Sequence, residues 1–274
     1  MTDAGTLAGA LANLPSGMAA VARVVQGVLI HRDWARAYGV SFTPDRLEDQ
    51  HVRSAGQRLT RIFALDSAPL DRARPPERRS VGTCRDFTLL SVAILRAHGI
   101  PARARCGFGA YFSKLYEDHW VVEYRRADAW VLADAQIDSV QANVLKPAFD
   151  LLDVPRDKFV IAFDAWQQAR SGKADPERFG IFDMRGLWFI AGNVVRDFAA
   201  LNKVEMLPWD VWDAMADRDR PISDSELALF DRLADLCSDP DETFGELRAL
   251  YEGDARLRVP KTVFNAVSNR PESV

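Results

Sequence analysis

A cysteine at the start of an apolar helix constrains this chain more than any other feature. Thr83 is a good N-cap residue, and Asp86, three positions later, completes a variant of the capping box. Cys84 is then the first helical residue. The run over 87–95 is apolar almost all round, which is typical of a helix buried on most sides. The sequence therefore predicts a central helix over 84–98 with a thiol at its N-terminus.

This placement favours chemistry at the thiol. The partial positive charge of a helix N-terminus stabilises a thiolate, which is the nucleophilic form of cysteine. The alternative is a small buried residue, which is what a free cysteine usually is. Cys106, in an alternating strand, and Cys237, on an apolar helix stripe, fit that alternative, and we expect both in the core.

A histidine and an aspartate lie at the ends of two adjacent predicted strands. His119 opens His-Trp-Val-Val-Glu-Tyr, and Asp134 closes Trp-Val-Leu-Ala-Asp. A hairpin centred between 126 and 127 places the two directly opposite, with Cβ atoms about 4.5–5.5 Å apart. A carboxylate there accepts one imidazole N–H and fixes the tautomer. A bulge would break this pairing, and alone each residue is an ordinary strand start or turn initiator. Asp118 is a rival carboxylate, which we expect to point away from His119.

Five short segments then follow one another in a characteristic order: Gly82-Thr83-Cys84-Arg85-Asp86, Leu95-Arg96-Ala97-His98-Gly99-Ile100-Pro101-Ala102-Arg103, Cys106-Gly107, Asp118-His119-Trp120 and Trp130-Val131-Leu132-Ala133-Asp134. Together they resemble the transglutaminase-like superfamily, which shares its core with papain-like cysteine proteases. The resemblance covers about residues 80–140.

The resemblance implies roles and a fold. It makes Cys84 the nucleophile, His119 the base and Asp134 the orienting residue. It implies an α+β fold in which the cysteine helix packs on an antiparallel sheet, with helical additions at both ends. A second oxyanion donor, beside the Cys84 backbone N–H, is expected from an upstream Gln or Trp side chain, for which Gln26 and Trp34 are candidates.

The rest of the chain predicts further elements. Apolar spacing indicates helices over 16–38 and 45–65 and two more between 223 and 251; strands are expected near 102–110, 119–125 and 130–134. A stretch rich in Pro and Arg, 69–80, is predicted to be a surface connection. The aromatic block 179–212 is favoured as a buried helix over a cleft wall with Asp183, Arg185 or Asn193 as polar contacts. The last 20 residues or so are expected to be loose.

One compact unit with three parts is predicted. Residues 1–70 form N-terminal helices packed on the core, 71–215 the transglutaminase-like catalytic core, and 216–274 a helical C-terminal extension. The 35 basic and 39 acidic residues are mixed, which predicts no nucleic-acid partner. Three scattered cysteines predict no disulfide framework. No apolar run of about 18 residues and no signal peptide are found, so we expect a bacterial, cytoplasmic protein without a membrane partner.

Three hypotheses follow for function. The first is cysteine acyl chemistry on a peptide, amide or small acyl substrate through a thioester, resolved by water or by an amine. The second is a transglutaminase-like binding module without catalysis. The third, a metal site of Cys84, Cys106 and His119, is disfavoured because Cys106 turns towards the core. No metal, calcium loop or cofactor is expected. The acyl donor, the acceptor and the oligomeric state are not predicted.

Overall fold

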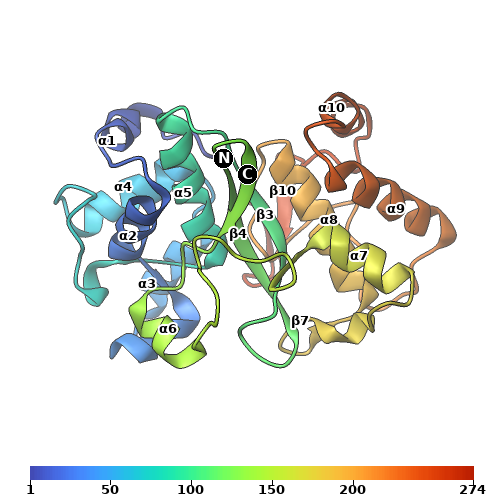
Figure 1. Cartoon of the computed structure of the whole chain (residues 1–274), viewed down its shortest axis with the longest axis horizontal. Helices are drawn as coiled ribbons and strands as arrows, with labels where there is room; N and C mark the ends of the chain where they lie inside the picture. The colour runs from blue at the N-terminus through green and yellow to red at the C-terminus, as the bar shows by residue number, and fades with distance from the viewer. The chain divides into compact units, whose positions relative to one another are not determined.

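The computed structural model describes residues 1–274, and the chain divides into two compact units. Unit 1 comprises Met1–Ala104 and Trp120–Pro155; unit 2 comprises Arg105–His119 and Arg156–Val274. Each unit contains helices and strands, so the predicted α+β class is confirmed (Figure 1). Strands β3 (Ala102–Gly109) and β4 (Tyr116–Arg126) each begin in one unit and end in the other. The predicted division at residues 70 and 215 stays a prediction.

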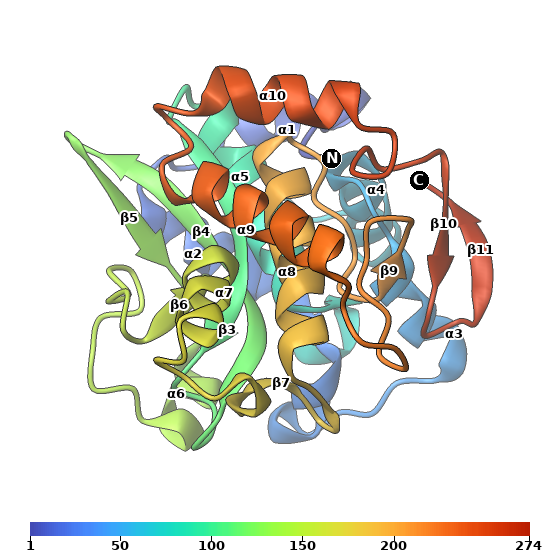
Figure 2. The ribbon, with the colours of Figure 1, turned by 90° about the vertical axis from the view of Figure 1, so that its right-hand side faces the viewer.

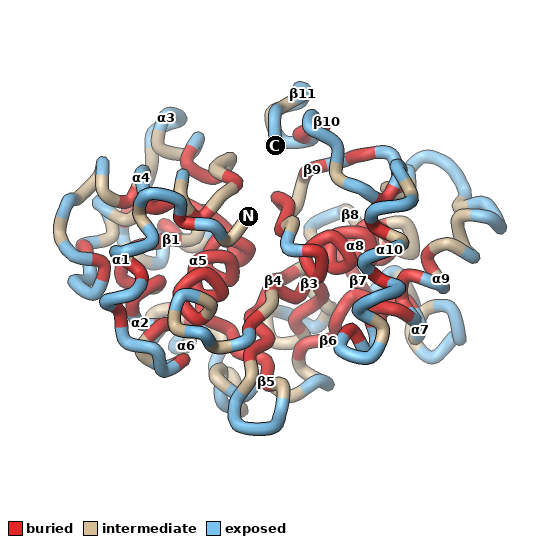
Figure 3. Tube along the Cα trace, turned by 90° about the horizontal axis from the view of Figure 1, so that it is seen from above, coloured by how far each residue is buried: buried red, intermediate tan, exposed pale blue.

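Unit 1 is built around the cysteine helix. Helix α5 (Cys84–Ala97) contacts three helices and a short parallel strand pair. Every residue from Cys84 to Leu95 is buried, as the continuous red tube of α5 in Figure 3 shows, so the predicted buried helix is confirmed. The surrounding elements are α1 (Ala8–Ala12), α2 (Met18–Val28), α4 (Ala55–Leu65), β1 (Leu29–His31) and β2 (Ser80–Gly82).

The helix predicted over 16–38 is wrong in its second half. Helix α2 ends at Val28, the chain forms strand β1, and residues Arg32–Tyr38 form the 3-10 helix η2. Strand β1 pairs with β2, so Ile30 lies beside Val81 and both are fully buried. Leu29 and Ile30 of the strand continue the apolar pattern of the helix before it, and periodicity does not separate the two elements.

The helix predicted over 45–65 is also interrupted. It consists of α3 (Pro44–Leu47), the 3-10 helix η3 (Glu48–His51) and α4. Ser54 starts α4: its hydroxyl accepts from the Gln57 backbone N–H at 3.2 Å, and the Gln57 side chain accepts from the Ser54 N–H at 3.1 Å. This reciprocal capping box fixes a new helix start.

The Pro- and Arg-rich connection is not wholly at the surface. Arg74 is 2% exposed, and its guanidinium donates to the carbonyl oxygens of Pro69 and Arg72 at 3.0 and 2.9 Å. An arginine can be buried when carbonyl oxygens take its N–H groups, and here the loop supplies them itself.

Unit 2 is built around a second buried helix, α8 (Leu187–Leu201). Helices α7 (Ala162–Arg170) and α9 (Asp224–Ser238) contact it, and the three lie side by side in Figure 2. All residues of α8 from Phe189 on are buried, so the buried helix predicted for the aromatic block 179–212 is confirmed for its middle part, while both ends of the block form short strands. The Arg105 guanidinium, on β3, binds the Asp197 carboxylate of α8 through two N–H···O contacts of 3.0 and 2.7 Å.

The strands of unit 2 form short ladders. Strand β6 (Phe159–Ile161) pairs with β3, and β7 (Phe179–Ile181) pairs with the start of β4 and with β8 (Met184–Arg185). The remaining α-helices and strands of unit 2 are α10 (Phe244–Gly253), β9 (Asp210–Val211), β10 (Thr262–Asn265) and β11 (Arg270–Ser273); α6 (Ser139–Leu145) and β5 (Ala129–Ala133) belong to unit 1. Because β10 pairs with both β9 and β11, the expectation of a loose C-terminus is wrong.

Candidate functional site

Cys84 is the first residue of α5, directly after the turn from β2. It is 6% exposed. The Asp86 carboxylate accepts the Thr83 backbone N–H at 2.8 Å, so the predicted capping box is confirmed. The helix start that carries the thiol is therefore fixed by its own sequence.

The cap carries a buried charge that two arginines neutralise. Asp86 lies 2.9 Å from the Arg58 guanidinium and 3.2 Å from that of Arg85, and all three residues are 0% exposed. Arg58, on α4, also donates to the Val81 carbonyl oxygen at 2.8 Å. The cluster thus ties α4, β2 and the first turn of α5 together beneath Cys84.

Gly82 is required by this cluster, because a Cβ there would lie 2.7 Å from a carboxylate oxygen of Asp86. We expect Gly82→Ala to lower the free energy of unfolding by about 1–3 kcal/mol, the usual cost of overpacking. Urea denaturation measures this. Gly9→Ala is the control, since a Cβ at Gly9 in α1 meets nothing and should stabilise by at most about 1 kcal/mol. Equal stability of Gly82→Ala and wild type would contradict this reading of the turn.

The candidate oxyanion residue Trp34 follows a strand that ends beside the strand leading to Cys84. Strands β1 and β2 are parallel, with His31 beside Gly82, so the chain leaves both strands at one edge. The chain continues from β2 to Cys84 and from β1 to Trp34 in η2. Trp34 is half-buried, and its indole N–H donates no hydrogen bond. His31 lies at this same end of the strands because β1 pairs with β2.

Gln26, the other candidate donor, binds the segment that follows Asp134. Its side-chain nitrogen donates to the carbonyl oxygens of Ala135 and Ile137, at 3.1 and 3.3 Å. An amide has two N–H donors, so both are engaged in this position. Gln26 would have to release one carbonyl to serve an oxyanion.

Asp134 follows the last residue of β5 and is 1% exposed. Its backbone N–H donates to the Leu151 carbonyl at 2.7 Å, and one carboxylate oxygen accepts the Gln136 N–H at 2.9 Å. The Asp134 side chain therefore initiates the turn that follows, which is the ordinary role that this residue has when it is considered alone.

The predicted register of the β4–β5 hairpin is wrong, because the centre of its turn lies one residue later than predicted. Val122 pairs with Ala133 and Arg126 with Ala129, so the turn consists of Ala127 and Asp128. Continued by one step, this register sets Asp134 opposite Val121 rather than His119. His119 is two residues from Val121 and hence on the same side of strand β4. The predicted direct opposition of His119 and Asp134 is therefore wrong.

His119 is 2% exposed and closes the first segment of unit 2. Three aromatic rings of that unit surround its imidazole. The ring of Phe112 is 4.7 Å away, that of Tyr111 6.0 Å and that of Phe159 6.3 Å, all presenting edge-to-face geometry.

Asp118 is held by helix α8. Its carboxylate accepts from the Asn193 side-chain nitrogen at 2.7 Å, and Arg196 donates to the Asn193 oxygen at 3.1 Å. Burial raises the pKa of the Asp118 carboxyl, while the Arg196 charge, the Asn193 hydrogen bond and the neighbouring His119 act in the opposite direction. Asn193, expected as a substrate contact in the cleft interpretation, thus binds Asp118. Asp183 pairs with Arg218, and Arg185 donates to the Phe182 carbonyl oxygen.

The segment that carries these residues is of a known class. Residues 67–135 match the family model of the transglutaminase-like superfamily, which confirms the resemblance seen in the sequence. All three predicted residues, Cys84, His119 and Asp134, fall inside the match. At a coarse level, the match supports papain-like cysteine chemistry.

Other comparisons add little. One similar solved structure is that of a candidate cysteine protease from Cytophaga hutchinsonii, at 17% identity and a TM-score of 0.22. The match covers 57% of this chain and spans 46% of that protein's length, and no conclusion follows from it. A search of curated proteins found no match. No helix of the chain has the length and apolar character needed to cross a membrane. No group of three or more His, Cys, Asp and Glu is placed to hold a metal ion.

Proposed function

We propose that this protein performs cysteine acyl chemistry on amide or ester substrates through a thioester. Cys84 is the nucleophile, His119 the general base and Asp134 the residue that orients the imidazole. The observation that carries the proposal is the position of Cys84, at the capped N-terminus of a buried helix within the superfamily match. The substrates proposed are peptides, other amides and small acyl compounds.

The chemistry proceeds in two steps. The Cys84 thiolate attacks the carbonyl carbon, a C–S bond forms, and the imidazolium of His119 gives its proton to the leaving nitrogen as the C–N bond breaks. Water or an amine then attacks the thioester, His119 takes a proton from it, and the C–S bond breaks to return the thiolate. Hydrolysis and transfer differ only in this second nucleophile.

Each step passes through an oxyanion that needs donors. We propose the backbone N–H of Cys84, in the first turn of α5, as the first donor. We propose the indole N–H of Trp34 as the second donor, because it makes no other bond while the Gln26 amide makes two. Losing one such donor typically costs about 2.7–4 kcal/mol of transition-state stabilisation.

Acylation by p-nitrophenyl acetate tests the proposal. We expect a burst of p-nitrophenol and one acetyl group on Cys84, located by peptide mass mapping. Acetylation at Cys106 or Cys237, or none at all in the folded protein, would overturn the proposal. The absence of any acylation would favour a binding module without catalysis.

A further inference from the structure

The loop between β3 and β4 places two aromatic residues against the proposed catalytic base. Tyr111 and Phe112 lie in this loop, their ring centres 4.7 Å apart, and both rings contact the imidazole of His119. All three residues belong to unit 2. The proposed chemistry assigns the two rings no role.

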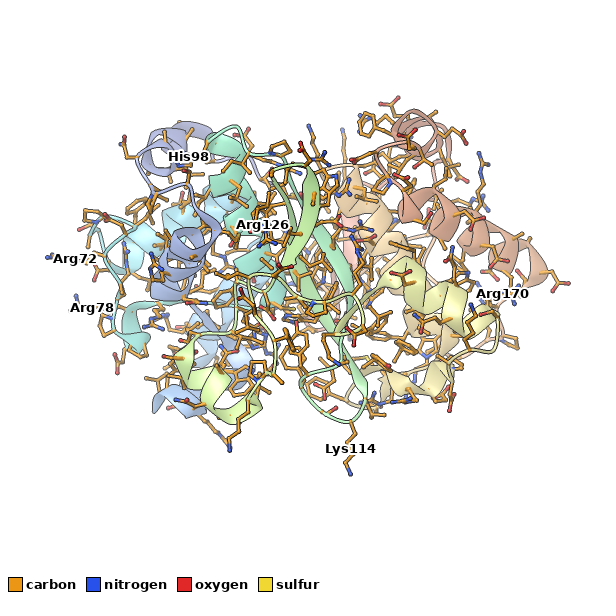
Figure 4. The ribbon with its side chains drawn as sticks, in the orientation of Figure 1. Arg72, Arg78, His98, Lys114, Arg126 and Arg170 are labelled. Atoms are coloured by element: carbon orange, nitrogen blue, oxygen red, sulfur yellow. The ribbon has the colours of Figure 1, made fainter.

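The strand before the loop is adapted to this arrangement. A Cβ on Gly109, the last residue of β3, would lie 2.7 Å from the Phe112 ring and 3.2 Å from the Tyr111 ring. Only glycine therefore lets both rings fold back over the end of the strand. Ser113 and Lys114, the next two residues, are exposed, and Lys114 points away from the ribbon in Figure 4. The loop turns its apolar side chains to His119 and its polar ones to solvent.

Core packing alone does not account for these rings. Phe159, the third ring near His119, is 0% exposed and is an ordinary core residue. Tyr111 and Phe112 both remain partly exposed. They therefore present apolar surface to water beside the imidazole, where a ligand group could cover it.

We propose that Tyr111 and Phe112 are specificity-determining residues that bind an apolar substituent on the amine side of the substrate. This inference rests on the proposed function. The imidazole exchanges its proton with the nitrogen that leaves or enters the acyl group, so the substituent on that nitrogen lies beside the groups around His119. The preferred substrates are then amides of aromatic or branched aliphatic amines, and the preferred acceptors are amines of that kind.

Competition between two amines for the acetyl group on Cys84 tests this inference. The enzyme is acetylated with p-nitrophenyl acetate and offered phenethylamine or 2-methoxyethylamine, and the N-acetyl products are quantified. An aromatic contact of about 0.5–1.5 kcal/mol predicts that wild type favours phenethylamine by roughly 2- to 12-fold after correction for free amine and intrinsic reactivity. Phe112→Ala and Tyr111→Ala should bring the ratio near one, Phe112→Leu should restore part of it, and Lys114→Ala should leave it unchanged.

Failure of the proposed function and failure of this inference give different results in this experiment. If no acetyl group reaches Cys84, the proposed function fails and this inference with it. If the acetyl-enzyme forms but the wild-type ratio is near one, or is unchanged in folded Phe112→Ala and Tyr111→Ala, only the inference is overturned. A preference for the diamine cadaverine over phenethylamine would also overturn it, since the rings would then bind a cation.

Discussion

Replacing Cys84 with alanine should lower kcat for any acyl substrate on the order of 10⁴- to 10⁶-fold, while the protein stays folded. Loss of a covalent nucleophile has effects of this size, because no thioester can form without the thiol. The base and the oxyanion donors then have no covalent intermediate on which to act. Stopped-flow measurement of p-nitrophenol release gives the rate. Circular dichroism and urea denaturation show whether the variant is folded.

The two other cysteines provide matched controls. Cys106 and Cys237 are both 0% exposed, within strand β3 and helix α9. Their alanine variants should lose some stability through the small cavity and keep their acylation at Cys84. If Cys84→Ala retained wild-type turnover, or if Cys106→Ala lost it without unfolding, the assignment of the nucleophile would be wrong.

Replacing Asp86 with alanine should lower the free energy of unfolding by about 3–5 kcal/mol. Breaking a buried ion pair leaves an uncompensated charge, and here the guanidinium groups of Arg58 and Arg85 both lose their carboxylate. The variant also loses the acceptor for the Thr83 N–H at the start of α5. Urea denaturation monitored by tryptophan fluorescence measures the change.

An exposed ion pair of similar geometry is the control. Glu252 lies 2.7 Å from Arg248 on helix α10, and both side chains are about half exposed or more. Glu252→Ala should change stability by about 0.3–0.5 kcal/mol, since solvent screens such a pair. Equal effects of the Asp86 and Glu252 substitutions would refute the role given to the buried cluster.

The cysteine helix could be predicted from sequence because its signals are local. The cap at Thr83, the apolar run and the breakers after it lie within 20 residues, and the structure reproduces them. The hairpin of β4 and β5 was recognised, but its register was not. Ala127 adopts a left-handed φ of 52°, and the turn contains no Gly or Asn to mark that position.

What sequence reasoning missed depends on distant partners. In the sequence, Arg58 looks like an ordinary helix residue; its buried ion pair is with Asp86, 28 positions later. Arg105 is likewise buried only because Asp197 of helix α8 binds it. The contact of Tyr111 and Phe112 with His119 arises from a loop whose conformation has no periodic signature. Such pairings are tertiary, and one sequence does not reveal them.

The pH dependence of Cys84 alkylation is the most direct test of the central claim, that Cys84 is a nucleophile served by His119. Iodoacetamide is applied to the folded protein across pH 5–10, and carbamidomethyl-Cys84 is quantified by peptide mass spectrometry in wild type and His119→Ala, with unfolded protein as reference. We predict that wild-type Cys84 reacts with a midpoint well below the ordinary thiol value of about 8.5, and that the midpoint moves up in His119→Ala. A midpoint near the ordinary value in wild type, unmoved in His119→Ala, would contradict the account.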